Sequence, residues 1–146
     1  MVLTPSGNWY YCAAQVPSWL LCQLQDRGDN QIPVLEALAV VMGLHTFQSM
    51  IESGCVTAFC DNNCVLQSFL KGTSRATEVN MMCGRLWLEM AKWEVGLHLL
   101  RVSSKSNPSD GPSRGNYELA EELKMTRVAV IWPEWLTEIM EIDDYQ

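Results

Sequence analysis

Residues 55–63 read Cys-Val-Thr-Ala-Phe-Cys-Asp-Asn-Asn, and this stretch decides the predicted fold. Six apolar or β-branched residues follow Gly54 and end at three polar ones, which is the pattern of a short buried strand. An uncharged strand of this length is typical of the centre of a sheet that helices cover on both faces. Asp61 stands where the strand ends, a position at which ligands gather in α/β folds.

The segments on either side of this strand predict helices and a second strand. Before it, Pro33 suits a first helical turn, and the almost wholly apolar helix that follows should be buried and end near Gly54. After it, Gly72 would end one helix. The pattern there predicts two helices and then a strand, over 63–70, 77–94 and 97–102.

The two ends of the chain complete the expected fold. Residues 1–16 predict a hairpin with arms over 1–4 and 9–16, residues 17–24 are ambiguous, and residues 25–30 predict a polar loop. Later elements are a polar connector, a helix, a strand and a short helix or turn, over 103–114, 117–124, 128–132 and 133–136. Strands that alternate with helices after a hairpin favour an α/β fold, with a mixed sheet covered by helices.

Length and composition limit the class of protein. A chain of 146 residues with 48% hydrophobic residues suits one domain with a sizeable core. It contains neither an uncharged run of 18 apolar residues nor a basic, apolar leader, so we expect an intracellular protein, cytoplasmic or nuclear, with no membrane partner. Its six cysteines lack metal-ligand spacing, which favours reduced, partly buried thiols.

The charge distribution bears on nucleic-acid binding. A net charge of −7 argues against a phosphate partner, but residues 117–146 hold eight acids and only two bases. Residues 71–114 carry seven bases and four acids, so this stretch could contact phosphates, although a solvated helical face is the simpler and slightly favoured explanation. The candidate nucleic-acid-binding residues are Asn62, Lys71, Arg75, Lys105, Asn107 and Arg114.

Three carboxylates are candidate catalytic and metal-binding residues, and each also has a structural explanation. Glu36 could interact with the dipole of the first turn of its helix, but a charge in a buried helix needs a partner. Asp61 could cap the next helix, and Asp110 could belong to an ordinary Asp-Gly turn. If the three converge, they form the kind of oxygen-ligand set that holds Mg²⁺.

Three strings together resemble the ribonuclease H-like domain of retroelement reverse transcriptase polyproteins. The first is Gln-Ile-Pro-Val-Leu-Glu-Ala-Leu-Ala at 31–39, and the second is Phe-Cys-Asp-Asn-Asn at 59–63, with Lys-Gly-Thr-Ser after it at 71–74. The third is Arg-Val-Ser-Ser-Lys-Ser-Asn-Pro-Ser-Asp-Gly-Pro-Ser-Arg at 101–114. The resemblance covers residues 1–120 and leaves 121–146 as an acidic C-terminal extension.

The resemblance implies a specific chemistry. In the family, four carboxylates in the order Asp, Glu, Asp, Asp hold two Mg²⁺ ions that hydrolyse the RNA strand of an RNA–DNA hybrid. It assigns Glu36 and Asp61 to the ion on the leaving-group side and Asp110 to the ion that activates water. It also implies recognition of the hybrid through its backbone and 2′-hydroxyls, and a reverse transcriptase domain in a longer polyprotein.

The chain departs from the family at its first carboxylate. That Asp lies on a first, central strand before the hairpin arm at residues 1–4, while Asp26 and Asp29 lie after the hairpin and cannot replace it. We therefore expect a domain without its first central strand and with impaired hydrolysis. The alternative is a non-catalytic remnant that binds nucleic acid or acts as a structural module. Integrases and junction resolvases fit less well, because they place an acidic residue late in the chain.

Overall fold

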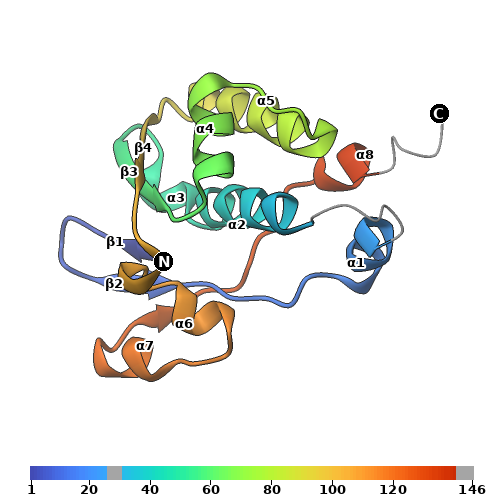
Figure 1. Ribbon diagram of the computed structural model, residues 1–146. Coiled ribbons are helices and arrows are strands. Elements are labelled where there is room, and N and C mark those ends of the chain that lie inside the picture. Colours follow the sequence, from blue (N-terminus) through green and yellow to red (C-terminus); the bar gives the residue numbers. More distant parts are fainter. Residues whose placement is uncertain (26–30, 141–146) are drawn as a thin grey trace.

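The computed structural model describes residues 1–25 and 31–140, in which short strands alternate with helices (Figure 1). The strands are β1 (Val2–Leu3), β2 (Trp9–Tyr11), β3 (Cys55–Cys60), β4 (Gly96–Arg101) and β5 (Thr126–Arg127). The helices are α1 (Ser18–Gln25), α2 (Ile32–Thr46), α3 (Gln48–Ile51), α4 (Asn63–Lys71), α5 (Thr77–Lys92), α6 (Asp110–Ser113), α7 (Glu118–Glu122) and α8 (Leu136–Met140), with a 3₁₀ turn η1 (Ser104–Ser106).

The strands form two separate small sheets. In the first, β1 and β2 pair antiparallel as the predicted hairpin, and β5 joins β2 in parallel, which gives a mixed sheet. In the second, β3 and β4 pair in parallel along their whole length, from Cys55 opposite Gly96 to Cys60 opposite Arg101. The predicted α/β class is confirmed, while the expected mixed sheet covered by helices is divided into these two small sheets within the described residues.

The core lies between α2, α4, α5 and one face of the β3–β4 sheet. Ala37 and Val41 of α2 are fully buried, as are Met82 and Leu86 of α5. The sequence predicts this arrangement for α2 because its apolar residues surround the helix almost completely. In Figure 1, α4 and α5 lie above α2, and the hairpin, α6 and α7 lie below it.

The prediction that residues 55–60 form a central strand covered on both faces is wrong. Within the described residues β3 pairs only with β4, and alternate side chains of both strands are exposed. Phe59 and Leu100, which are partners in the register, are 60% and 50% exposed. The β3–β4 sheet therefore packs its inner face on the helices and leaves an apolar pair on its outer face.

The helix predicted from Pro33 to near Gly54 is interrupted. Helix α2 ends at Thr46, and Phe47 leaves helical geometry (φ −98°, ψ 14°) before the single turn of α3. The Phe47 side chain is buried at the point of the break. Ser53, at φ 58°, then reverses the chain, and its N–H donates to the carbonyl of Trp93 (2.8 Å).

The strand predicted over 128–132 is also wrong. The pairing ends at Arg127, and residues 128–133 have no regular structure although Val128 N–H still donates to Tyr11 (2.8 Å). This segment leaves the sheet and packs Val130 and Trp132 against the helical core. The ambiguous residues 17–24 lie mostly in α1. Most of the predicted 25–30 loop, with Asp26 and Asp29, lies outside the described residues.

The cysteines are free thiols, as the sequence predicts. Only Cys60 and Cys83 are buried, and Cys22, Cys55 and Cys64 are exposed. Burial raises the pKa of the Cys83 thiol to about 11. Among the described residues, no helix combines the length and apolarity needed to cross a bilayer.

Candidate functional site

The candidate site begins where β3 passes into α4. Asn62 is the N-cap of α4, because its side-chain oxygen accepts hydrogen bonds from the N–H groups of Cys64 (2.8 Å) and Val65 (3.1 Å). The sequence suggested Asp61 as a possible cap of this helix, but the capping residue is the next one, Asn62. Gly72, at φ 68°, ends α4 in the left-handed region, as predicted.

Helix α2 brings Glu36 to the same place. The helix begins at Ile32, so Glu36 lies beyond its first turn, and the predicted interaction with the first-turn dipole does not apply. Burial raises the pKa of the Glu36 carboxyl, and the negative charge of Asp61 raises it further, while a side-chain hydrogen bond with Asn62 lowers it. Two carboxylates 25 positions apart in the printed sequence therefore lie close enough for their charges to interact.

Cys60 shares this environment at the end of β3. Its thiol has a raised pKa, mainly because it is buried and also because Glu36 and Asp61 are negative, although a hydrogen bond to the Asn62 backbone acts in the opposite direction. The Cys60 S–H donates to the Asn62 carbonyl (3.6 Å). A protonated thiol thus borders the carboxylate pair, which makes oxygen the dominant ligand atom at this point.

One oxygen of Glu36 is unsatisfied. Its Oε2 is buried and has no hydrogen-bond partner within the described part of the chain. A buried carboxylate oxygen without a partner is unfavourable, and a cation would relieve it. The donor set of Glu36 and Asp61 therefore fits a hard divalent ion such as Mg²⁺, which prefers oxygen ligands.

Asp110 interacts with a different partner from those of Glu36 and Asp61. It is the first residue of α6, and its Oδ1 accepts a hydrogen bond from Nε of Arg114 (3.1 Å), an exposed ion pair one turn apart. Within residues 1–25 and 31–140, no three His, Cys, Asp or Glu side chains form one group able to hold a metal ion. The structure therefore brings Glu36 and Asp61 together, and it does not add Asp110 to them.

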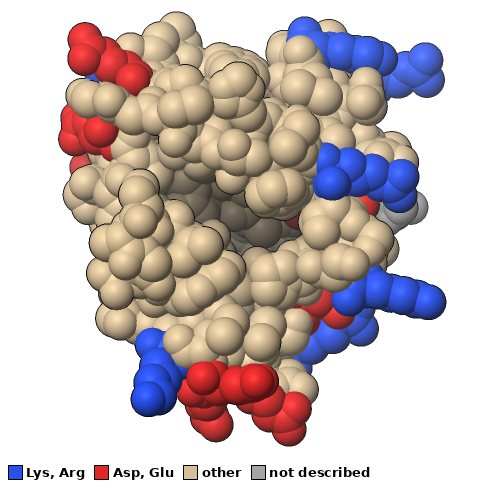
Figure 2. Space-filling view, turned by 90° about the vertical axis from the view of Figure 1, so that its left-hand side faces the viewer, with Lys and Arg blue, Asp and Glu red and all other residues tan. Residues whose placement is uncertain are grey.

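The candidate nucleic-acid-binding residues differ in their availability. Lys71, Arg75 and Lys105 are exposed. Arg114 is exposed but paired with Asp110, and both asparagines use their side-chain oxygens locally, Asn62 as a cap and Asn107 as an acceptor from Ser109 N–H (3.1 Å). Figure 2 shows one face of the molecule, with Lys and Arg mainly along its right-hand margin and a hollow of uncharged residues at its centre.

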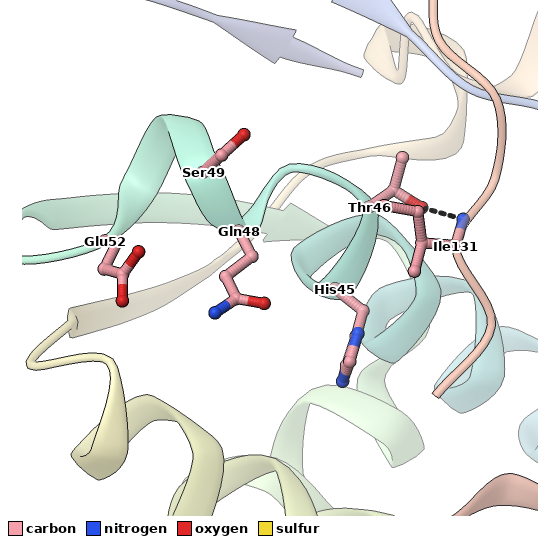
Figure 3. A pocket seen from close by; sticks show the side chains of 6 residues that line it. All are labelled: His45, Thr46, Gln48, Ser49, Glu52 and Ile131. Carbon is pink, nitrogen blue, oxygen red and sulfur yellow. Dashed lines mark hydrogen bonds between the residues drawn. The ribbon is translucent and has the colours of Figure 1, made fainter. Parts of the chain in front are cut away.

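A pocket that the sequence did not indicate lies beside the end of α2 (Figure 3). Its volume is about 350 Å³, and its lining residues are His45, Thr46, Gln48, Ser49, Glu52 and Ile131. His45 and Gln48 point to one side of this segment and Ser49 to the other. The N–H of Ile131 donates to Oγ1 of Thr46 (3.1 Å), and the two residues are 85 positions apart in the sequence. A local sequence pattern does not predict such a contact.

Comparisons with protein-family models, with curated proteins and with solved structures gave no match to this chain.

The raised pKa of Glu36 predicts a pH-dependent effect of Glu36→Gln. Because the folded chain holds this proton more tightly than the unfolded chain, ionisation of Glu36 destabilises the fold as pH rises through the folded-state pKa. Glu36→Gln should therefore stabilise the protein at neutral pH, by less than about 1 kcal/mol because water screens the partly exposed group. Below the ordinary carboxyl pKa the two proteins should be equally stable.

Urea unfolding at several pH values measures this difference. Glu122→Gln removes a carboxylate from an exposed position of α7 and is the matched control. A neutral-pH loss of stability in Glu36→Gln would show that the carboxylate is held by a favourable partner.

Proposed function

We propose that this chain is a ribonuclease H-like domain of retroelement type, which binds RNA–DNA hybrids and whose Mg²⁺-dependent hydrolysis of the RNA strand is impaired. The observation that carries the proposal is the meeting of Glu36 and Asp61 at the carboxyl end of β3. These residues come from two of the three strings that resemble the family. Their convergence is what the resemblance requires.

The residues present would hold Mg²⁺ through Glu36 and Asp61. The ion would supply Lewis-acid polarisation of a scissile phosphate. The chain's own contribution is to place two oxygen ligands at a rigid strand end, with Glu36 fixed by the buried helix α2 and Asp61 by the start of α4. Asn62 keeps Glu36 oriented through its side-chain hydrogen bond.

One feature supports impairment. Within the described residues, Asp110 pairs with Arg114 instead of joining Glu36 and Asp61 in one group of ligands. Two carboxylates for one ion lack the symmetric clamp on attacking and leaving oxygens that two-metal hydrolysis uses.

The alternative is a non-catalytic nucleic-acid-binding module, and the exposed Lys71, Arg75 and Lys105 favour it. Bases outside the carboxylate site would neutralise phosphates whether or not hydrolysis occurs. Both readings include hybrid binding, so binding and cleavage must be measured separately. In the first reading, the natural context would be a longer polyprotein with a reverse transcriptase domain.

The test is a cleavage assay on a labelled RNA–DNA hybrid with Mg²⁺ or Mn²⁺, beside a binding assay with the same hybrid. We expect binding with at most trace cleavage, and loss of that trace in Asp61→Asn. Asp110→Asn is the comparison variant, since Asp110 lies outside the pair. Robust cleavage that Asp61→Asn abolishes would contradict impairment, and no preference for hybrid over an uncharged competitor would contradict the function itself.

A further inference from the structure

Residues 128–138, here called the strap, cross the end of α2 and run along α5. Their backbone makes few hydrogen bonds to other elements: Val128 N–H donates to the Tyr11 carbonyl, and Ile131 N–H to Oγ1 of Thr46. Residues 128–133 have no regular structure. The strap is therefore held on the molecule mainly by its side chains.

Two strap side chains enter the core. Trp135 is 8% exposed and Leu136 is 2% exposed, and both belong to the cluster that contains the buried residues of α2 and α5. Helix α8, which begins at Leu136, contacts α5. This burial holds the strap closed by the hydrophobic effect.

A single carboxylate oxygen joins the strap to two helices. Oε1 of Glu89, on α5, accepts hydrogen bonds from Nε1 of Trp135 (2.6 Å) and from Nε2 of His45 on α2 (2.9 Å). The His45 ring also meets the Trp93 ring edge-on, with 5.1 Å between centroids.

The ion pair between the strap and α5 is weak by comparison. Arg85 donates to Glu138 (3.1 Å), but both side chains are about half exposed or more, at 47% and 66%. Exposed ion pairs contribute little, whereas loss of a partner from a buried carboxylate leaves a desolvated charge. Oε2 of Glu89 is already buried without a partner in the described residues, so loss of the Trp135 donor would leave this carboxylate still less satisfied.

We propose that the strap is a releasable element that opens as one unit, with Glu89 as its latch. Opening breaks the Trp135–Glu89 and Ile131–Thr46 hydrogen bonds and bares Trp135, Leu136 and the helical surface beneath them. The β3–β4 sheet and α4 share no hydrogen bond with the strap among the described residues, so they stay folded when it opens. Such subglobal opening is the expected behaviour of a segment with few backbone hydrogen bonds.

The experiment is native-state hydrogen exchange on the whole chain, read by mass spectrometry. Trp135→Phe keeps a buried ring but removes the indole donor, and we expect amide exchange in residues 131–138 to accelerate about tenfold or more, with β3 and β4 unchanged. Trp132→Phe is the matched control, because the Trp132 indole has no hydrogen-bond partner among the described residues. Its exchange in the strap should stay close to that of the original chain.

A double variant tests whether Glu89 is the latch. Once Glu89→Leu has removed the acceptor oxygen, adding Trp135→Phe should accelerate exchange much less than Trp135→Phe does in the original chain, since both substitutions remove the same bond. The unaltered chain in low urea provides a second test that needs no variant. We expect the strap amides to exchange through an opening that exposes less of the protein than the opening through which the amides of β3 and β4 exchange. Three outcomes would overturn the proposal. They are faster exchange in all elements of Trp135→Phe, additive effects in the double variant, and one common opening for all amides in low urea.

Discussion

Phe69→Ala is expected to cost about 3–5 kcal/mol of folding free energy. The Phe69 ring is 1% exposed on α4 and belongs to the core cluster, so its removal leaves a cavity that the surrounding helices fill only in part. The loss is a large fraction of the roughly 5–15 kcal/mol that stabilises a typical domain. We expect a marked fall in the urea midpoint, or loss of cooperative unfolding.

The chain offers a matched control for this substitution. Phe59→Ala removes the same ring from β3, where the side chain is 60% exposed on the outer face of the sheet. We expect a loss below about 1 kcal/mol, which is the range of substitutions outside the core. Equal losses at the two positions would mean that the outer face of β3 is buried in solution.

The second large effect is expected on hybrid binding. The triple variant Lys71→Gln, Arg75→Gln, Lys105→Gln should weaken binding to an RNA–DNA hybrid by roughly two to three orders of magnitude at low salt. Each lost phosphate contact removes the release of about one counterion, so the slope of log affinity against log salt should fall by roughly one for each residue. Fluorescence anisotropy across a salt series measures both quantities.

Net charge alone could weaken binding, and a second triple variant separates this effect. Lys92→Gln, Lys124→Gln, Arg127→Gln makes the same change in charge at exposed residues outside the candidate set. Its salt slope should match that of the original chain. Equal weakening by both variants would mean that binding depends only on the net charge of the protein. The candidate residues would then make no specific phosphate contacts.

Local patterns predicted the elements that carry the candidate site. The uncharged run at 55–60, followed by polar residues and Gly72, predicted β3 and α4 almost to the residue. The meeting of Glu36 and Asp61 followed from the expectation that ligands gather at a strand end. The assignment of the cap to Asn62 instead of Asp61 could not be predicted, because both residues suit a helix N-terminus.

The features that the sequence did not predict depend on contacts between distant residues. The break at Phe47 was not predicted, because the apolar pattern itself continues to Ile51. The irregular path of residues 128–133 depends on Thr46 and on the core beneath Trp132, while their composition is that of a strand. Likewise, Glu89 receives its two donors from 44 and 46 positions away.

The outer face of the β3–β4 sheet has a consequence for handling the protein. Strand β3 carries no charge or proline, pairs on one side only within the described residues, and presents Phe59 next to Leu100. Natural sheets block such edges with charges, prolines or bulges, because an unprotected edge serves as a template for intermolecular β-pairing. We expect pairing of β3 edges from different molecules to increase with protein concentration and to lead towards amyloid-like stacking. The monomer should therefore be best preserved in dilute samples.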